Sequence, residues 1–372
     1  MWKIGFDAKR ALLNNTGLGN YSRALIQSLS ENYPENEYYL YSPKISNNRH
    51  KQAIKRSNTS FRTTKFPVLK SLWRSRFIIS DLKKDQLDIF HGLSHELPIG
   101  IQKTGIKTIV TIHDMIFLRY PQYYTRIDRK IYEQKCRYAC TIADKIIAVS
   151  EQTKSDLQNF FHISEQKIEV IYQSCAPAFK QSYSESELKT VTEKYKLPKR
   201  FLLTVGTIEE RKNLMLLVES IKQLPEDISL VVVGKSTSYA DKVKEYIIKN
   251  KLLHRILFLE KVPFDDLPKI YQSADIFVYP SFFEGFGIPI LEALNMGVPV
   301  IATTGSCLEE AGGPGSIYVN PNHAIELSEI IIHLWDNDEK KREMIREGKK
   351  YAEQFEPQKL AAQMMDLYQN IL

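Results

Sequence analysis

The run Ser281–Leu294 reads SFFEGFGIPILEAL, and it directly follows the short apolar run Ile276–Tyr279. A short apolar run, a glycine-containing loop and a longer apolar run predict a strand, a loop and a helix in that order. Gly285 and Gly287 let the loop backbone approach a ligand closely. Pro289 suits the first position of a helix, where its missing N–H costs no hydrogen bond.

Two carboxylates flank this helix start. We expect Glu284 to lie in the loop and Glu292 in the first turn of the helix. The free N–H groups of a helix N-terminus carry partial positive charge and bind anions. A phosphate held between two carboxylates that bind hydroxyl groups describes a pocket for a nucleotide sugar. The alternative is that Glu292 only complements the helix dipole and that the glycines only form a turn.

Short apolar runs alternate with amphipathic runs twice along the chain. The first series of predicted strands is Trp2–Phe6, Tyr38–Tyr41, Ile89–His91, Lys107–Ile112, Lys145–Val149 and Ile168–Ile171. The second series is Phe201–Val205, Ser229–Val233, Ile256–Phe258, Ile276–Tyr279, Val300–Ala302 and Ser316–Val319. This alternation predicts an α/β protein with two Rossmann-like, doubly wound domains, whose ligand sites lie at the carboxyl ends of the strands in an interdomain cleft.

The domain boundaries follow from the polar segment between the two series. We expect a first domain over residues 1–180, a strandless linker over 181–198 and a second domain over 199–355. Residues 356–372 have helical periodicity and are expected to cross back to the first domain.

Composition sets limits on the location of the protein. No apolar run approaches the ~18 residues needed to cross a bilayer, and the N-terminus MWKIGFDAKR lacks the apolar core of a signal peptide. We therefore expect a cytoplasmic protein. The four cysteines show no zinc-site spacing and are expected to be buried thiols.

The positive charge is concentrated in the first half. Residues 1–180 hold 28 Lys and Arg against 16 Asp and Glu, and many of the cations lie in Arg49–Arg76. This segment mixes cations with Phe61, Phe66, Leu72 and Trp73, a mixture that can seat on an anionic membrane at the inner face of the plasma membrane. The alternative is a solvated helix face and loop. Nucleic acid is not expected as a partner, because no standard recognition module is present.

Chemically rich loops follow the predicted strands. Arg211 and Lys212 precede a helix that starts near Asn213, a good N-cap residue, and two cations there are poor structural choices but suit an anionic ligand. The same loop begins with Gly206 and Thr207.

Two loops of the first domain are further candidates. His113 follows an apolar strand and suits a hydrogen bond to a sugar hydroxyl, although a structural histidine is the alternative. Gly17 and Gly19 precede a helix and can let backbone N–H groups approach an anion, or can form a simple loop. His91 follows another strand, but its loop lacks other site chemistry.

The pair Asp336 and Asp338 is the only Asp-x-Asp in the chain. It follows a helical run rather than a strand, so we expect a surface turn between helices and no metal site.

Four stretches resemble family 4 (group 1) glycosyltransferases. They are VGTIEERKNL (Val205–Leu214), PSFFEGFGIPILEALNMGVPVIAT (Pro280–Thr303), VTIHDM (Val110–Met115) and AVSEQTKSDL (Ala148–Leu157). The resemblance implies the GT-B architecture, with the acceptor bound by the first domain and the nucleotide sugar by the second. It also implies retention of anomeric configuration and no need for a metal or other cofactor.

The resemblance implies roles for individual residues. Arg211 and Lys212 would bind the donor diphosphate, Glu284 the donor sugar and Glu292 the ribose. The residues implied to assist are the backbone N–H groups of Phe286, Gly287 and Ile288, the side chain of His113 on the sugar, Gly17 and Gly19 over the phosphate, and Gly206 and Thr207 in the donor site.

The expected activity is transfer of a hexose to a glycan or lipid-linked oligosaccharide in surface polysaccharide biosynthesis. The HDM and FEGFG patterns favour GDP-mannose-type donors within the resemblance. A nucleotide-sugar 2-epimerase and a catalytically silent protein of the same fold are the alternatives.

Overall fold

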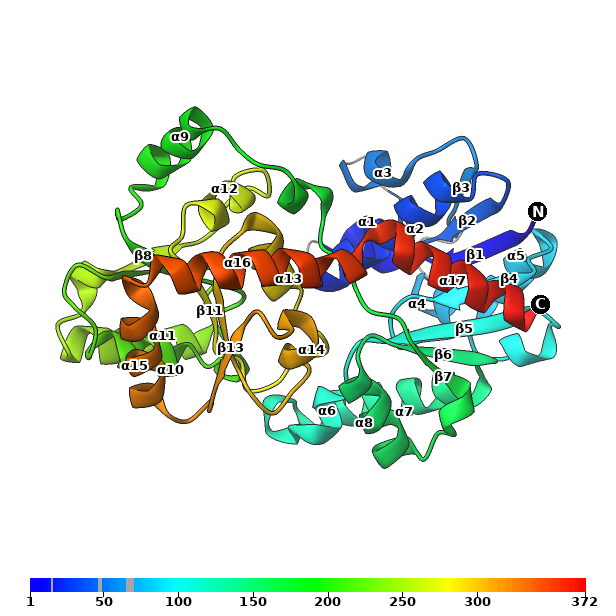
Figure 1. The fold of residues 1–372 in the computed structure, drawn as a ribbon. Helices are drawn as coiled ribbons and strands as arrows, with labels where there is room; N and C mark the ends of the chain where they lie inside the picture. Colours follow the sequence, from blue (N-terminus) through cyan, green and yellow to red (C-terminus); the bar gives the residue numbers. More distant parts are fainter. Residues whose placement is uncertain (15, 46–48, 65–69) are drawn as a thin grey trace. The chain divides into compact units, whose positions relative to one another are not determined.

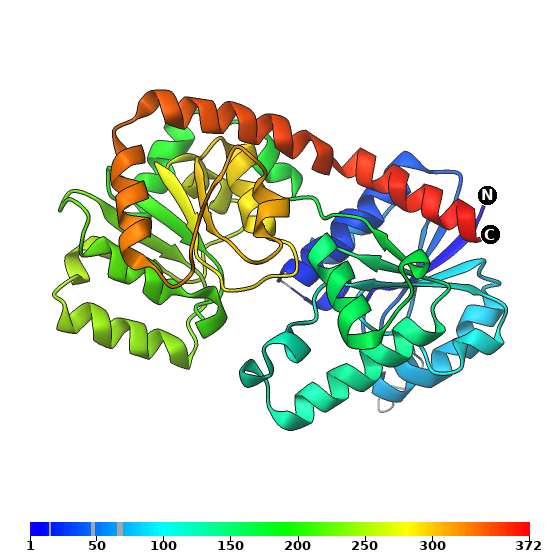
Figure 2. The same cartoon turned by 60° about the horizontal axis from the view of Figure 1, so that its bottom comes forward.

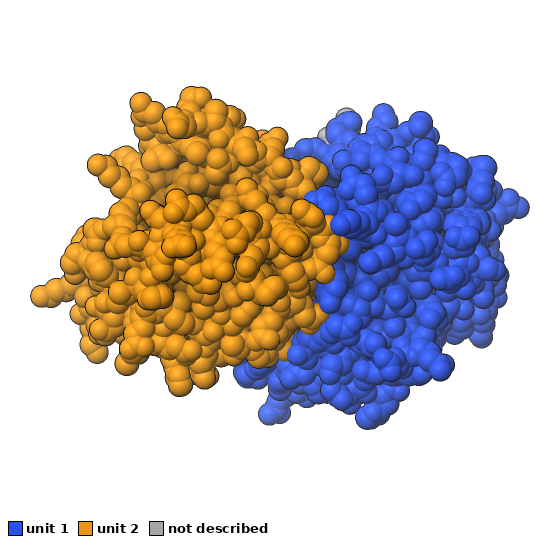
Figure 3. Space-filling view, in the orientation of Figure 1, with its two compact units in different colours: residues 1–174, 355–372 blue, residues 175–354 orange. Residues whose placement is uncertain are grey.

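The computed structural model describes residues 1–14, 16–45, 49–64 and 70–372. The chain forms two compact units, residues 1–174 with 355–372 and residues 175–354, shown in different colours in Figure 3. Each unit contains one parallel sheet.

The first unit contains a seven-stranded sheet in the order β3-β2-β1-β4-β5-β6-β7. Its strands are β1 Lys3–Asp7, β2 Glu37–Tyr41, β3 Thr59–Arg62, β4 Ile89–Gly92, β5 Lys107–Ile112, β6 Lys145–Ala148 and β7 Ile168–Val170. Its helices are α1 Lys9–Leu13, α2 Gly17–Asn32, α3 Arg49–Ile54, α4 Lys70–Leu72, a π-helical turn Trp73–Phe77, α5 Ile78–Lys84, α6 Ile116–Arg119, α7 Arg126–Ile142, α8 Glu151–Phe161 and α17 Pro357–Ile371. Neighbouring residues of the central strands are buried in different apolar clusters, Ile89 in one and Phe90 in the other. Both faces of this sheet are therefore covered, as expected for parallel strands.

The second unit contains a six-stranded sheet in the order β10-β9-β8-β11-β12-β13. Its strands are β8 Phe201–Val205, β9 Ser229–Val233, β10 Ile256–Leu259, β11 Ile276–Tyr279, β12 Val300–Thr303 and β13 Ile317–Val319. Its helices are α9 Glu185–Tyr195, α10 Leu214–Ile221, α11 Ser238–Lys249, α12 Leu267–Gln272, α13 Ile288–Met296, α14 Leu308–Gly312, α15 Ala324–Trp335 and α16 Asp338–Ala352. The strand order is that of a doubly wound nucleotide-binding fold. Two Rossmann-like α/β domains are thus confirmed (Figure 1).

All twelve predicted strands are present, and β3 is the one strand among the described residues that the sequence pattern did not predict. β3 lies inside the basic segment Arg49–Arg76 and is an edge strand of mixed polarity. Its Arg62 pairs with Asp85, and Arg56 pairs with Glu31. Part of the positive charge of this segment is therefore neutralised by ion pairs within the first unit. Residues 65–69, which include Phe66, lie outside the described residues.

The chain enters the second unit at Cys175, earlier than the polar segment 181–198 that we expected to be a linker. That segment contains α9, which begins with a capping box between Ser184 and Glu187 and packs against α12. The C-terminal helix α17 packs against α2 of the first unit (Figures 1 and 2). Over the described ranges, we found no helix that is both long and apolar enough to span a membrane.

Candidate functional site

The candidate site lies where the strand order of the second sheet reverses, between β8 and β11. Ligands of doubly wound proteins bind outside the carboxyl ends of the strands at this point, because the two loops there diverge to opposite faces. The loop after β8 carries Arg211 and Lys212, and the loop after β11 carries Glu284.

The loop after β8 holds its two cations in a one-turn 3₁₀ helix, Glu210–Lys212. Asn213 then adopts a left-handed conformation with φ 53° immediately before α10. Asn213 is the N-cap residue of α10, as expected, but its side chain makes no capping hydrogen bond and donates to the carbonyl of Pro321 at 2.8 Å. This bond fixes the turn that presents Arg211 and Lys212.

The loop after β11 leads into α13, as the quoted sequence predicts. Gly287 has φ 118°, and a Cβ there would lie 3.1 Å from Leu308, so both its conformation and its surroundings require glycine. The helix begins at Ile288, which puts Pro289 second and Glu292 in the second turn. The expected position of Glu292 in the first turn was therefore wrong.

Cys307 holds this loop in place from the N-terminal side of α14. Its thiol donates to the carbonyl oxygens of Glu284 and Phe286 at 3.0 and 3.2 Å. From the sequence we expected Cys307 only to be a buried thiol. The four cysteines of the chain are all buried thiols, as expected.

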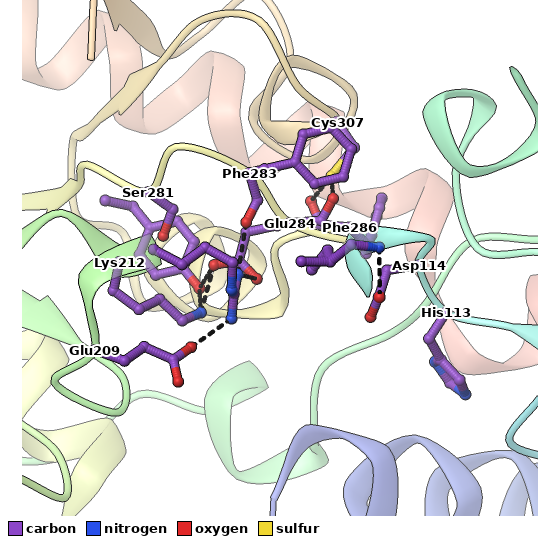
Figure 4. Close-up of polar contacts among 12 residues, drawn as sticks. His113, Asp114, Glu209, Lys212, Ser281, Phe283, Glu284, Phe286 and Cys307 are labelled. Atoms are coloured by element: carbon purple, nitrogen blue, oxygen red, sulfur yellow. Dashed lines mark hydrogen bonds and ion pairs between the residues drawn. The ribbon is translucent and has the colours of Figure 1, made fainter. Parts of the chain in front are cut away.

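Five side chains form what we call the Glu284 cluster: Glu209, Arg211, Lys212, Tyr279 and Glu284 (Figure 4). The Lys212 ammonium donates to Glu284 Oε1 at 2.5 Å and to the Tyr279 hydroxyl at 2.6 Å. The Arg211 guanidinium lies 2.8 Å from Glu284 Oε2 and 2.7 Å from Glu209 Oε1. The structure thus joins three of the predicted site residues through direct ion pairs.

Burial and charge act against each other in this cluster. Burial alone would raise the pKa of Glu284, but Arg211 and Lys212 outweigh it and hold that pKa at about 2. Burial lowers the pKa of Lys212, and the attraction of Glu284 offsets this only in part because Arg211 is adjacent. Two buried cations thus share the buried carboxylate of Glu284, and Arg211 also pairs with the more exposed Glu209, so the charges balance two against two. Strongly shifted pKa values of this kind are frequent at functional sites.

Gly206 and Thr207 lie beside this cluster. Both line a cavity of about 20 Å³ together with Lys212 and Tyr279. A Cβ on Gly234, after β9, would overlap the carbonyl oxygen of Gly206. Gly234 and Tyr279 were missed in the sequence, where the only signal was their position directly at the end of predicted strands.

Glu292 faces a different environment. It is 8% exposed and accepts a hydrogen bond of 2.8 Å from the Tyr271 hydroxyl. Burial raises its pKa to about 7, which that hydrogen bond only partly opposes. Glu292 is therefore a carboxyl group poised between its two protonation states near neutral pH, and not a member of the Glu284 cluster.

His113 directly follows β5 in the first unit, as predicted. Its Nε2 donates to the carbonyl of Leu93 at 2.9 Å, and its Nδ1 accepts from the Gln173 amide at 2.9 Å. The Tyr21 ring packs edge-on at 4.8 Å. Burial, with a smaller contribution from His95, lowers the pKa of His113 to about 3. The imidazole is therefore neutral at physiological pH.

Gly17 and Gly19 occupy the first turn of α2 and not a loop before it, so that expectation was wrong. A Cβ on Gly19 would overlap the carbonyl oxygen of Asn14. Arg23 donates to the carbonyls of Ala11 and Asn14 at 2.8 Å each, which ties the preceding chain to the helix. Close packing at the helix start explains Gly19.

Asp336 and Asp338 lie at the turn between α15 and α16, as predicted, and Asp336 pairs with Arg200. Among the residues that the structure describes, no group of three or more His, Cys, Asp or Glu side chains is arranged to hold a metal ion.

Two family models match the chain. Residues 16–175 match the model of Glycosyltransferase Family 4, and residues 187–351 match the model of Glycosyl transferases group 1.

Curated relatives and solved structures agree with these matches. O-antigen chain mannosyltransferase B of Escherichia coli is 26% identical over 385 residues, covering 98% of this chain and 99% of that protein. O-antigen chain mannosyltransferase RfbU of Salmonella typhimurium is 28% identical over 233 residues, covering 61% and 59%. A glycosyltransferase from Rickettsia africae ESF-5 superposes with a TM-score of 0.78 at 19% identity, covering 100% and 98%. Anabaena Alr3699/HepE, solved with UDP and glucose, superposes at 0.76 and 16% identity with full coverage of both chains.

Proposed function

Because the chain belongs to the group 1, family 4 glycosyltransferases, we propose that it transfers a hexose from a nucleotide diphosphate sugar to a hydroxyl group of a glycan or lipid-linked oligosaccharide. The observation that carries this proposal is the pairing of Arg211 and Lys212 with Glu284 at the switch point of the second sheet. A guanidinium and an ammonium can bind the two phosphates, while a carboxylate accepts hydrogen bonds from sugar hydroxyls.

Mannose from GDP-mannose is the donor that we favour. Its support is the similarity to two O-antigen mannosyltransferases, one of which aligns over nearly the whole chain. The acceptor in that case is a growing surface polysaccharide.

The proposed reaction retains the anomeric configuration. The bond between the anomeric carbon and the diphosphate oxygen breaks, and the electron pair leaves with the oxygen. Arg211, Lys212 and the N–H groups at the start of α13 stabilise that negative charge. The acceptor oxygen bonds to the anomeric carbon on the face that the diphosphate leaves, and its proton passes to the departing phosphate. The products are a glycoside and a nucleoside diphosphate.

This route uses protein cations in place of a metal ion, so we propose that turnover is metal-independent. Addition of EDTA to the purified enzyme should leave its turnover unchanged, and a loss that added Mg²⁺ or Mn²⁺ restores would contradict the proposal.

The remaining predicted residues have supporting roles in this proposal. Glu292 accepts the ribose hydroxyls, and ligand hydroxyls would favour its ionised form and lower its pKa from about 7. For His113 to donate to the sugar, its Nε2–H exchanges the Leu93 carbonyl for a sugar hydroxyl. The donor site is completed by the backbone N–H groups of Phe286, Gly287 and Ile288, together with Gly206 and Thr207. The start of α2, with Gly17 and Gly19, faces the phosphate in this proposal.

The test is a screen of purified protein for hydrolysis and transfer across nucleotide sugars, followed by Lys212→Ala. The variant should raise the barrier by about 2–4 kcal/mol, as loss of a preorganised anion-binding group does elsewhere. Lys249→Ala, an exposed lysine of the same unit, is the control. Full turnover by Lys212→Ala would refute the assignment. Release of an epimerised free sugar without acceptor would instead indicate a 2-epimerase.

We also propose peripheral contact with an anionic membrane at the end of the basic segment Arg49–Arg76. Leu72 and Phe77 are 51% and 54% exposed, and Lys70 and Arg76 beside them are exposed cations. Apolar side chains among cations suit a membrane interface. The protein should sediment with vesicles containing anionic lipid and lose this binding at high salt, whereas binding that is indifferent to anionic lipid would reject the proposal.

A further inference from the structure

The first sheet also reverses its strand order, between β1 and β4. Beside these strands lies a cavity of about 310 Å³, which we call the switch-point cavity. It is lined by Asp7, Arg74, Ser75, Ile78, Phe90, Glu96, Leu97, Pro98, Ile99, Gln134, Lys135 and Tyr138. Its size and its place in the fold are those of a small-molecule site.

One part of the cavity wall is a chain of alternating charges. Arg74 contacts Asp7 through two nitrogens, at 2.5 and 2.8 Å, and contacts Glu96 at 2.6 Å. Lys135 lies 3.3 Å from the other oxygen of Glu96. The Arg74 and Asp7 side chains are only 14% and 10% exposed. The two carboxylates and two cations therefore form a net-neutral polar wall, which is buried at Arg74 and Asp7 and exposed at Lys135.

The rest of the wall is mainly apolar. It comprises Ile78, Phe90, Leu97 and Pro98, all buried, and Ile99, which is 52% exposed. The Tyr138 hydroxyl accepts from the Gly100 N–H at 2.9 Å and donates to Gln102 at 3.2 Å, so its proton is used outside the cavity.

The backbone departs from α-helical geometry at this cavity. Arg74 and Ser75 belong to the π-helical turn Trp73–Phe77 between α4 and α5. Such turns are rare, occur mostly as single-turn bulges inside α-helices, and are frequent at functional sites. Here the turn carries the arginine that links both carboxylates.

We propose that the switch-point cavity binds an uncharged glycoside with an apolar aglycone, the apolar part against Ile78, Phe90 and Leu97 and the sugar hydroxyls against the charged wall. Hydroxyl groups can donate to Asp7 and Glu96 and accept from Arg74. An anionic head group would be repelled by the two carboxylates, and a cationic head group would be repelled by Arg74 and Lys135. That this ligand is the acceptor of transfer rests on the proposed function, whereas its binding does not.

The test is calorimetric titration with hexyl, octyl and decyl β-glucosides below their critical micelle concentrations. Affinity should rise about four-fold for each added methylene, the increment expected for burial of one CH₂ group. Octyl sulfate and octyl trimethylammonium should bind more weakly than octyl glucoside. Affinity that is independent of chain length, or equal for the three head groups, would overturn the proposal.

Matched variants localise the binding. Ile99→Asp places a charge on the cavity wall and should weaken octyl glucoside binding about ten-fold, the loss expected when the isoleucine side chain no longer packs against the bound alkyl chain. Ile127→Asp makes the same change on α7 at a residue that is 74% exposed and outside the cavity, and it should bind like the wild type. Equal effects of the two variants would refute this location.

A second pair tests the polar wall. Glu96→Gln removes a carboxylate that lines the cavity and should lower the ratio of the affinity for octyl glucoside to that for octyl sulfate. Glu133→Gln on α7 should leave this ratio unchanged. An unchanged preference in Glu96→Gln would contradict the assigned role of this wall. Donor hydrolysis is measured on the same preparations to separate the two proposals. Loss of glucoside binding with intact hydrolysis would refute the cavity proposal but not the proposed function. Loss of hydrolysis with intact glucoside binding would refute the proposed function but not the cavity proposal.

Discussion

Replacement of Glu284 by glutamine tests the central electrostatic claim about the candidate site. The pKa of Glu284 falls from an ordinary 4.5 to about 2 because Arg211 and Lys212 stabilise its charge. At 1.36 kcal/mol per unit, this interaction stabilises the folded second unit by about 3 kcal/mol at neutral pH. In Glu284→Gln the new amide side chain keeps the shape but removes the charge, which leaves buried Arg211 paired with the more exposed Glu209 and removes the carboxylate that Lys212 contacts.

The assay is hydrogen exchange of peptides from β11 and the following loop at pH 7. Loss of about 3 kcal/mol corresponds to roughly 100-fold faster exchange of amides that open with the unit. Glu193→Gln, at an exposed glutamate 3.9 Å from Lys189, is the matched control and should change exchange little. A nucleoside diphosphate should partly restore protection in Glu284→Gln, because its phosphates replace the missing negative charge.

The pH dependence follows from the direction of the shift. A lowered folded-state pKa contributes stability that is present above pH 4.5 and is lost as the pH falls towards 2. The glutamine variant should therefore lack this part of the acid-induced loss of stability. Exchange within a few-fold of the wild type at pH 7, or an identical acid dependence, would refute the argument.

Three further substitutions test other parts of the structure. The raised pKa of Glu292, about 7, favours its protonated form, so the wild type loses stability as the pH rises from 4.5 through 7. In Glu292→Gln, the fall in the free energy of unfolding between pH 5 and pH 8, measured in urea, should be about 2 kcal/mol smaller than in the wild type. An equal fall in both proteins would contradict the burial of this carboxyl. Tyr368→Phe removes the hydroxyl that lies 2.7 Å from Nδ1 of the fully buried His91 and should lower the free energy of unfolding by about 1–3 kcal/mol, whereas an unchanged value in urea would show that this bond contributes nothing net. Gly287→Ala should lower the thermal midpoint by an amount equivalent to about 1–3 kcal/mol, because φ 118° strains any residue with a Cβ, and an unchanged midpoint would contradict that backbone geometry.

Much of the fold could be predicted because parallel strands buried on both faces read as continuous apolar runs. Phe201–Val205 and Ile276–Tyr279 were located to the residue. The edge strand β3 could not be found in this way, since Thr59–Arg62 has only half-buried residues and lies among cations. Helix starts were less accurate, as α2 shows by including Gly17 and Gly19, because glycine favours a loop locally but tertiary packing can require it in a helix.

The residues of the candidate site likewise include some that the sequence predicted and some that it did not. Loop residues after the strands could be identified from charge and glycine content, and Arg211, Lys212 and Glu284 do lie together. Sequence alone could not identify Tyr279, Cys307 and Gly234, because their importance arises from contacts with residues far away in the sequence, such as the contact of Tyr279 with Lys212. The switch-point cavity likewise depends on Asp7, Arg74 and Glu96 meeting from three separate segments.

The sequence by itself determined the α/β class, the two parallel sheets and the loops that carry the chemistry, because these depend on local periodicity and on residue type. Only the tertiary structure decided which charges pair, which carboxyl group is ionised and which is poised near neutrality. Glu284 and Glu292 are both buried glutamates from one stretch of fourteen residues, Ser281–Leu294. Their pKa values of about 2 and about 7 differ because one meets two cations and the other meets a tyrosine hydroxyl, and those partners come from other elements of the fold.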